Sequence, residues 1–478
     1  MMTDKVKRWA LLAAGVACCC GLSAQSEATT AEGADPLTAT GTANSLPTEM
    51  ADSLPATWDL QRCIDHALQH NISVRKGRLQ AESSAIDVKT ARAAFLPSIQ
   101  GSISQRGVNR PWSESSTLIS GDQIKTSQSK TSYNGSYGID LNWTLYNGSR
   151  LNTLKQNELN SRIASLNVAE SENSIQEQIA QIYIQILYAS EALKVNEQTL
   201  EVSQAEYDRG AQLFEAGSIA KSDLAQLQAQ VSTDRYNVVT AQATLADYKL
   251  QLKQLLELDG EEEMQLLLPI PSNEQILTPL PLKADVYQQA LVLRPEIEAG
   301  KLNIETAELD IKIARAGYLP TLSLTAGVGT SHANGSDFTF SEQLKQNWNN
   351  SLGLSLSIPI FNQRQTKSAI QKAKIQKQSS QLDLLDAQKT LYKTIEGLWL
   401  DANSAQQRYA AALEKQQSTQ VSYDLVQEQF NLGMKNTVEL LTEKSNLLNA
   451  QQETLQAKYM ALLNAQLLRF YQGEALKI

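Results

Sequence analysis

The two halves of the chain carry the same arrangement of residues, and this duplication restricts the fold more than any other feature of the 478-residue sequence. Residues 87–99 read DVKTARAAFLPSI and residues 310–322 read DIKIARAGYLPTL, so the two stretches align without a gap. Three further landmarks recur in the same order: Ala67-Leu68 at Ala290-Leu291, Tyr207-Asp208 at Tyr423-Asp424, and Gly217 at Gly433. Because the order is kept, we predict two copies of one structural unit.

Each copy contains two stretches in which apolar and polar residues alternate, as they do in β-strands. The predicted strands are about 98–106 and 136–146 in the first copy, and about 321–330 and 351–361 in the second. A strand of about ten residues can cross a bilayer when it is tilted. We interpret seven apolar residues as lipid-facing: Tyr137, Ile139, Leu141, Trp143, Leu352, Leu354 and Leu356.

The alternation alone fits a half-buried strand of a soluble sheet equally well. An export signal, long helices and the lack of other strands favour the membrane. Four strands cannot close a barrel, and an open sheet edge in lipid leaves backbone groups unpaired. Several copies are therefore needed, and three would give 12 strands, with Ser351 and Ser355 facing a wet lumen. Residues 107–133 and 331–350, rich in small polar residues, are predicted outer loops.

Two prolines mark the predicted helix-to-strand junctions, Pro97 and Pro320. Proline cannot donate the next helical hydrogen bond, and it disfavours a helical residue before it. Each proline therefore stops a helix where a strand must begin.

Long helices account for most of each copy. Residues 151–214 contain no proline and no glycine before Gly210, which predicts about 100 Å of helix. Apolar residues recur seven apart, as in Ile179 and Ile186, and the returning helix continues with Leu224 and Val231. This period predicts coiled-coil packing. Gln, Ser and Asn fill much of the remaining surface, which suits the wall of a tube; a soluble coiled-coil rod is the alternative.

A glycine separates the two helices of each hairpin, since glycine readily adopts the left-handed conformation that ends a helix. An acidic residue follows six residues later in both copies. Ser222 and Thr437 are predicted to cap the returning helices. A docking surface is the functional interpretation, and it comprises Gly217, Ser218, Asp223, Leu224, Gly433, Met434, Glu439 and Leu440.

The N-terminus resembles an export signal. Lys5, Lys7 and Arg8 precede a short apolar stretch and Ala24, so residues 1–24 are a predicted signal peptide. Cys18 would carry a lipid if Gly-Val-Ala-Cys served as a lipidation site. Residues 25–56 are a predicted flexible segment. The repeats are 57–258 and 282–472, joined by a crossover at 259–281 and followed by a tail at 473–478.

Composition and side-chain chemistry exclude several function classes. The formal net charge of −9 argues against a nucleic-acid partner. Cys63, His66 and His70 share a predicted helix face and could bind zinc or copper, but the second copy has no such ligands. With three histidines and no nucleophile–base pattern, we expect no enzyme activity, no cofactor and no metal.

The ordered, duplicated landmarks resemble the outer membrane efflux protein family, the TolC-like exit ducts of Gram-negative bacteria. The resemblance runs from about Trp58 to Gln472. It is carried by Ala67-Leu68, ARAAFLP, ARAGYLP, WTLYNGSR at 143–150, IPIFNQR at 358–364, and the two hairpin tips. The first copy departs at Thr144, where the second has Pro359.

The resemblance implies a mixed α+β membrane protein that is mostly α. It implies a homotrimer in which a 12-stranded outer-membrane β-barrel continues into a long periplasmic α-helical barrel of coiled coils. It further implies an exit duct of a tripartite efflux system that passes small molecules such as drugs or toxic compounds. The tips would contact a periplasmic adaptor (membrane fusion) protein, itself bound to an inner-membrane pump.

Relatives in this family often carry carboxylates at the periplasmic constriction, and Asp208, Asp424 and Glu428 are the candidate gate acids here. Threefold symmetry would turn a lumen-facing acid into a ring that favours cations. A solvated helix face is the other interpretation. Two other functions stay open: a type I protein secretion duct, which shares the architecture, and a soluble periplasmic coiled-coil scaffold.

Overall fold

The computed structural model describes residues 57–477, except 113–115, 121–122, 128–130, 259–263, 270, 273–275 and 337. The predicted signal peptide, Cys18 and the 25–56 segment lie outside the described residues. The chain divides into the units Met1–Pro55 and Ala56–Ile478, and all described residues belong to the second.

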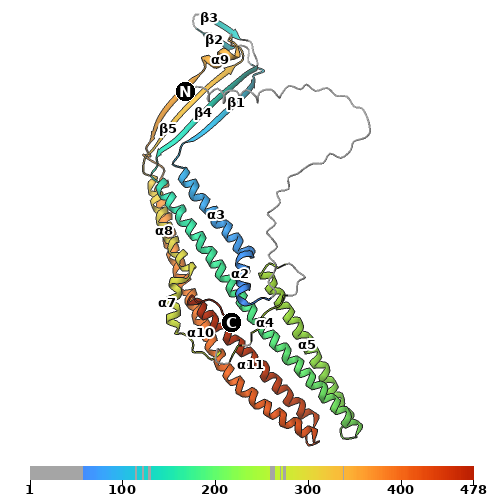
Figure 1. Cartoon of the computed structure of the whole chain (residues 1–478). Coiled ribbons are helices and arrows are strands. Elements are labelled where there is room, and N and C mark those ends of the chain that lie inside the picture. Colours follow the sequence, from blue (N-terminus) through green and yellow to red (C-terminus); the bar gives the residue numbers. More distant parts are fainter. Residues whose placement is uncertain are drawn as a thin grey trace, which may run out of the picture. The chain divides into compact units, whose positions relative to one another are not determined.

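The two copies contain the same series of elements (Figure 1). The first comprises α2 (Leu60–His70), α3 (Ile72–Ala93), β1 (Ser98–Asn109), β4 (Thr131–Tyr146), α4 (Arg150–Glu215) and α5 (Lys221–Leu255). The second comprises α7 (Lys283–Leu293), α8 (Pro295–Ala316), β5 (Thr321–Ala333), β6 (Asn349–Ser357), α10 (Gln365–Asn431) and α11 (Thr437–Tyr471). The duplication predicted from the sequence is confirmed.

Shorter elements lie between the paired strands. The hairpin of β2 (Ser116–Ser120) and β3 (Gln123–Ser127) separates β1 from β4, and α9 (Phe340–Gln346) separates β5 from β6. β1, β4 and β5 run a few residues beyond the predicted strands, into the segments predicted as loops. Pro97 and Pro320 lie directly before β1 and β5, four residues after the last residues of α3 and α8.

The last predicted strand is too long. β6 ends at Ser357, so Ile358 and Ile360 are not part of it, and Ile360 is 96% exposed. Pro359 is the physical reason, because it has no N–H to donate to a ladder and restricts the residue before it. β4 also departs from regular alternation, since its register to β5 shifts between Thr144 and Tyr146.

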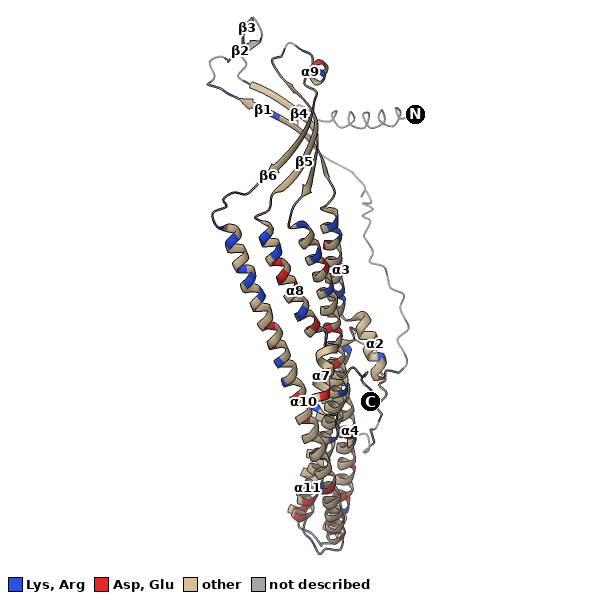
Figure 2. Cartoon of the chain, turned by 90° about the vertical axis from the view of Figure 1, so that its left-hand side faces the viewer, with Lys and Arg blue, Asp and Glu red and all other residues tan. Residues whose placement is uncertain are grey.

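The strands and the long helices follow one another in the same spatial order. The sheet is antiparallel with order β1-β4-β5-β6. Next to the sheet, α3 packs on α4, α4 on α8, and α8 on α10; towards the hairpin ends, α5 packs on α4, α4 on α11, and α11 on α10. Each strand is thus joined to the helix that continues its row (Figure 2).

The long helices match the heptad prediction closely. α4 runs from Arg150 to Glu215, against a predicted helix of 151–214. Ile179, Ile186 and Val231 are buried, while Leu224 is only half-buried. Among the described helices, none has the combination of length and apolar character that a bilayer-spanning helix requires.

The largest core cluster joins the N-terminal helix to the middle of α4 and the end of α11. Cys63 is fully buried there, near Tyr183. Burial, with a smaller contribution from Asp59, raises the pKa of the Cys63 thiol to about 12. The thiol is therefore protonated at neutral pH and packs as an apolar side chain.

We expect Cys63 in the chain without residues 1–24 to resist maleimide at pH 8. With a pKa of about 12, its thiolate fraction at this pH is about a thousandfold smaller than that of a free thiol. Since the thiolate is the form that reacts with maleimide, labelling is slow. Mass spectrometry after labelling measures this, and labelling in guanidinium chloride is the control. Rapid labelling of the folded protein would contradict the burial of this side chain.

Candidate functional site

The strand register gives the sheet one apolar and one polar face. Ile139 lies opposite Gly101 and Val328, and Leu354 lies opposite Leu324. The seven residues predicted as lipid-facing therefore share one face. This face is uncovered within the chain, since the side chains of Ile103 and Leu352 are each 78% exposed. An uncovered apolar surface of this extent indicates a binding partner or a membrane.

Aromatic side chains border this apolar face at both ends. Near α3, Trp143 Nε1 donates to the carbonyl of Phe95 at 2.9 Å. Towards the loops, Tyr137 stacks on His332 with ring centroids 5.8 Å apart, and Phe340 and His332 form a T-shaped pair with ring centroids 4.8 Å apart. Aromatic girdles at both interfaces are typical of outer-membrane barrels.

The opposite face of the sheet is polar and lined by small residues. Ser323, Ser351 and Ser355 lie on it. Asp140 and Gly327 pair across β4 and β5, and a Cβ on Gly327 would come within 3.0 Å of Asp140 Oδ1. The only ionisable residues on this face of the four described strands are Arg106 and Asp140. Such a surface suits contact with water.

Both lateral edges of this arrangement lack a partner within the described chain. β1 pairs only with β4, and β6 only with β5. The edge helices carry exposed apolar residues at heptad spacing, with Leu79 65% exposed on α3, and Ile375 and Leu382 65% and 66% exposed on α10. At each edge, therefore, the outer strand and the outer helix both lack a partner within the described chain.

The hairpin tips are turns that require glycine. Gly217 and Gly433 have φ angles of +74° and +72°, and an added Cβ would meet nothing within 4 Å. Backbone conformation, and not space, therefore selects glycine at both positions. Ser218 is exposed, and Met434 is 71% exposed at the second tip. The neighbouring Leu432, which the sequence analysis did not single out, is 75% exposed.

The predicted caps are wrong by one or two positions. The N-cap residues are Ala220 and Asn436, not Ser222 and Thr437. Asn436 Oδ1 accepts from the Glu439 N–H at 2.9 Å, and a Glu439 oxygen accepts from the Asn436 N–H at 3.2 Å. Asn436 precedes the helix in extended conformation, where its side chain reaches the free N–H groups.

The tip acids are therefore capping residues. Asp223 accepts from the Ala220 N–H at 3.3 Å, as Glu439 accepts from the Asn436 N–H, but Ala220 has no side-chain acceptor to return the contact. Lys435 Nζ lies 2.8 Å from Glu439, and this hydrogen bond, followed by the one from the Asn436 N–H, lowers the pKa of Glu439. Both carboxylates fix the shape of a tip.

Leu440 was predicted as a docking residue, and the structure contradicts this. Its side chain is fully buried in a cluster with Leu227, Tyr423 and Phe430. The amphipathic period of α11 explains the error, because position 440 faces the other helices and not the tip surface. Leu224 is half-buried.

The candidate gate acids Asp208, Asp424 and Glu428 are exposed in the chain. Gln204 Nε2 donates to Asp208 at 3.0 Å, and Gln420 Nε2 donates to Asp424 at 2.9 Å. The two aspartates thus have matching surroundings in the two copies. They lie on different hairpins, Asp208 on α4 and Asp424 on α10.

Sequence reasoning missed a buried charged cluster, here named the Lys444 cluster: Ser203, Glu206, Asp234, Tyr423 and Lys444. Lys444 Nζ lies 2.9 Å from Glu206 Oε2 and 3.7 Å from Asp234 Oδ2, and it also donates to Ser203. All five residues are buried. They come from α4, α5, α10 and α11, so one network joins both hairpins.

Tyr423 completes this network by donating to Glu206 Oε1 at 2.6 Å. Burial first, and then the Glu206 carboxylate, raise the pKa of the Tyr423 hydroxyl, so it remains a donor. A sequence signal existed, because Lys444 lies three residues after Leu441, at the second core position of the heptad. Lys458 follows Leu455 in the same way and binds Glu191 Oε2 at 3.1 Å.

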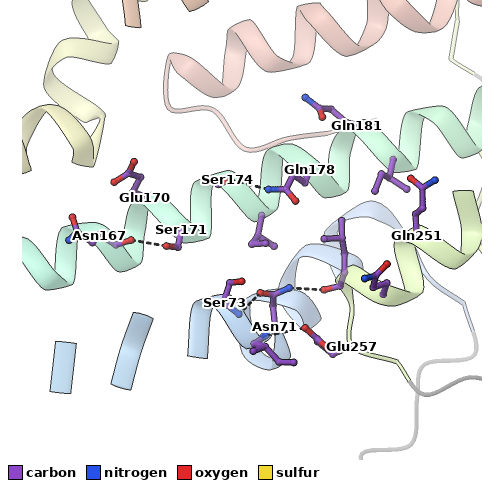
Figure 3. Close-up of a pocket in the computed structure, with 15 residues that line it drawn as sticks. Asn71, Ser73, Asn167, Glu170, Ser171, Ser174, Gln178, Gln181, Gln251 and Glu257 are labelled. Carbon is purple, nitrogen blue, oxygen red and sulfur yellow. Dashed lines mark hydrogen bonds between the residues drawn. The ribbon is translucent and has the colours of Figure 1, made fainter. Parts of the chain in front are cut away.

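A polar groove of about 930 Å³ lies where α3 begins, beside α4 and the end of α5 (Figure 3). Asn71 Nδ2 donates to the Leu255 carbonyl at 3.0 Å, and its Oδ1 accepts from the Ser73 N–H at 2.9 Å. Burial, followed by Glu296, raises the pKa of Glu170 in the lining. Amides and hydroxyls dominate the groove, and the arrangement contains no nucleophile–base pair.

The possible metal ligands have other roles in the structure. Cys63 is buried, while His66 and His70 contact each other with ring centroids 4.3 Å apart. Trp58 and His66 form a T-shaped pair with ring centroids 5.3 Å apart, and burial lowers the pKa of His66. No group of three or more His, Cys, Asp or Glu residues in the described part of the chain is placed to hold a metal ion.

Comparison with protein families gives two matches to one family, described as outer membrane efflux protein. They cover residues 63–257 and 286–474, which correspond to the two copies. The outer membrane protein TolC of Escherichia coli (strain K12) is 23% identical over 422 residues, covering 86% of this chain and 81% of TolC. The cation efflux system protein CusC of Escherichia coli O157:H7 is 25% identical over 415 residues, with coverages of 84% and 83%.

A third relative is named for protein secretion and not for efflux. The alkaline protease secretion protein AprF of Pseudomonas aeruginosa is 22% identical over 386 residues, covering 80% of this chain and 77% of AprF. Among solved structures, CusC has a TM-score of 0.72 at 20% identity, covering 86% of this chain and 91% of its own. The Campylobacter jejuni CmeC outer membrane channel has a TM-score of 0.71 at 18% identity, with coverages of 88% and 87%. These structures share the fold of the chain.

We expect Lys444→Ala to lower the free energy of unfolding by about 3–5 kcal/mol, because it leaves Glu206 and Asp234 buried without a counter-ion. Lys415→Ala is the matched control, since Lys415 pairs with Glu453 at 2.7 Å on the surface, where a pair contributes about 0–1 kcal/mol. Thermal loss of the helical circular dichroism signal in detergent compares the two variants. Equal shifts would contradict the assignment of a buried network.

Proposed function

The chain belongs to the outer membrane efflux protein family, and we propose that three copies of it form the exit duct of a tripartite export system. It is an outer membrane efflux channel, as its family and relatives are. The observation that carries the assembly is the four-stranded sheet with two unpaired edges. Backbone groups at such edges need partners in lipid.

Ring closure by identical contacts satisfies both edges. β6 of one copy pairs with β1 of the next, and α10 packs beside α3 and α5 of that next copy. A head-to-tail contact of this kind closes into a ring when the rotation permits. Three copies then give a 12-stranded β-barrel continued by an α-helical barrel. The exposed apolar residues of α3 and α10, including Leu79 and Leu382, support this contact.

The two faces of the sheet determine its orientation in the ring. The apolar face contacts outer membrane lipid through Tyr137, Ile139, Leu141, Trp143, Leu352, Leu354 and Leu356. The polar face lines a water-filled lumen. A soluble periplasmic scaffold is the weaker alternative, because it leaves this apolar face without a cover.

The hairpin tips are proposed to dock onto a periplasmic adaptor protein, which reaches an inner-membrane pump. Exposed Gly217, Ser218, Gly433 and Met434 form the contact surface, together with Leu432. Asp223 and Glu439 hold the tips in shape, and half-buried Leu224 supports the first tip. Leu440 is excluded from the contact because it is buried.

The proposed cargo is small molecules such as drugs or toxic compounds. A protein secretion duct is the second candidate, because the alkaline protease secretion protein AprF matches most of the chain. A deletion strain distinguishes the two. We expect it to become sensitive to drugs and to regain resistance when the gene is restored. Unchanged drug sensitivity with loss of a secreted protein would favour the second candidate.

Opening is proposed to occur by rearrangement of the coiled coils at the periplasmic end. Asp208, Asp424 and Glu428 lie on the tipward parts of α4 and α10. In a trimer each residue that faces the lumen forms a ring of like charges, which attracts cations.

For lipid contact, we expect Leu354→Arg to reduce the amount of folded protein in the outer membrane fraction. An arginine on the lipid face at mid-membrane destabilises such barrels by about 2–4 kcal/mol. Ser355→Arg, one residue along on the polar face, is the matched control and retains the folded protein. Equal loss in both variants would contradict the assignment of the faces.

For the gate acids, we expect Asp424→Ala to lower the cation-to-anion permeability ratio by about twofold or more in planar bilayers at low salt, because three charges leave the pore. Asp247→Ala is the control, since Asp247 is also exposed and also accepts from a glutamine four residues away. An unchanged permeability ratio in Asp424→Ala would contradict the proposal that Asp424 forms a ring of charges in the pore.

A further inference from the structure

The duplicated hairpins create two kinds of seam in the proposed ring. Within one chain, α4 of the first hairpin meets α11 of the second. Between chains, the equivalent meeting is of α10 with α5 of the next copy. The copies align at a constant offset here, because α5 and α11 have the same length and Gly217 corresponds to Gly433. Each residue at one seam therefore has an equivalent at the other.

Two ion pairs tie the seam within a chain, a buried one at Lys444 and a partly buried one at Lys458. Lys444 binds Glu206 at 2.9 Å, and Lys458 binds Glu191 at 3.1 Å. The first of these pairs also reaches Asp234 on α5 and, through Glu206, Tyr423 on α10. All four helices of the two hairpins are thus joined in one network.

The equivalent positions between chains carry no charge. Gln228 and Gln242 on α5 correspond to Lys444 and Lys458, while Ser422 and Gln407 on α10 correspond to Glu206 and Glu191. Gln228, Gln242 and Gln407 are exposed in the chain. Ser422 donates to Glu443 of its own hairpin at 3.1 Å, so it too is no substitute for the buried glutamate.

Apolar packing differs between the seams in the same direction. Val195, Val202 and Leu448 line a cavity of about 170 Å³ between α4, α10 and α11. Their equivalents in the other seam are Ala411, Ser418 and Ser232, which are smaller or more polar. The charged residues at this seam, Glu414, Lys415 and Arg235, correspond to the neutral Gln198, Thr199 and Gln451, and Lys415 pairs with Glu453 of its own hairpin at 2.7 Å.

From this asymmetry we propose that the two hairpins of a chain move as one rigid unit, and that the periplasmic end opens along the seams between chains. The inference rests on the proposed ring. A buried ammonium group that slides past its carboxylates loses its partner before it gains water, so the ties hold the stagger of α4 and α11. Neutral amides and hydroxyls can exchange hydrogen-bond partners as helices slide. The helices at the seam between chains therefore separate before those at the seam within a chain.

Matched cysteine pairs test this in the assembled protein. Thr199→Cys with Gln451→Cys places thiols on the two walls of the cavity within a chain. Lys415→Cys with Arg235→Cys places them at the equivalent positions between chains. Both pairs leave the buried ties intact, and buried Cys63 stays in place. A short bis-maleimide links each pair, and gel electrophoresis in SDS separates single chains from covalent trimers.

We expect the link within a chain to leave open-state conductance and drug export within about twofold of the unlinked protein, whereas the link between chains lowers both by about tenfold or more. Loss of opening with the first link, or opening with a formed covalent trimer, would overturn the inference alone. Failure of the second pair to give any covalent trimer would contradict the proposed ring, and the inference with it.

A transplanted tie provides the second test. Gln228→Lys with Ser422→Glu installs between chains the pair that Lys444 and Glu206 form within one. We expect drug export to fall by about tenfold while the trimer remains intact, with Gln228→Lys alone as the unpaired control. Export unchanged by the transplanted pair would contradict the assignment of the moving seam.

Discussion

Pairing of backbone groups is the constraint on which the rest of the structure depends. A strand in lipid cannot donate its N–H groups to water, so a sheet there must have no edge. The main sheet in the described part of the chain has four strands, and within it β1 and β6 are unpaired on their outer sides. One copy is therefore incomplete as a membrane structure, and the proposed ring obtains closure from further copies. The proposed lumen and lipid surface both follow from that closure.

The duplication extends the same requirement into the helices. Because each strand continues into a helix of the same row, an open sheet edge is also an open helix edge. One contact between copies thus has to complete both layers. The duplication also makes the two kinds of hairpin seam comparable residue by residue. Buried lysines form ion pairs only at the seam within a chain. This difference underlies the proposal that contacts within a chain persist on opening while contacts between chains change.

Regular periods made most of the fold predictable from the sequence. Alternation located the four strands, and proline-free heptads located α4 within a residue at each end. Local chemistry was less predictable, because Asn436 was a better cap than Thr437 and Pro359 ended β6 early. The Lys444 cluster escaped prediction since its members lie as far apart as Ser203 and Lys444, and only packing brings them together. Buried Leu440 shows that closeness to a turn does not imply exposure.

The number of chains in the detergent-solubilised particle tests the central claim most directly. Native mass spectrometry after extraction from the outer membrane gives this number without a label or a variant. Closure of four-stranded sheets into one barrel predicts three chains per particle, with a strong β-sheet contribution alongside the helical circular dichroism signal. A stable, folded single chain in the same fraction would contradict the account, because its two sheet edges would then need no partner.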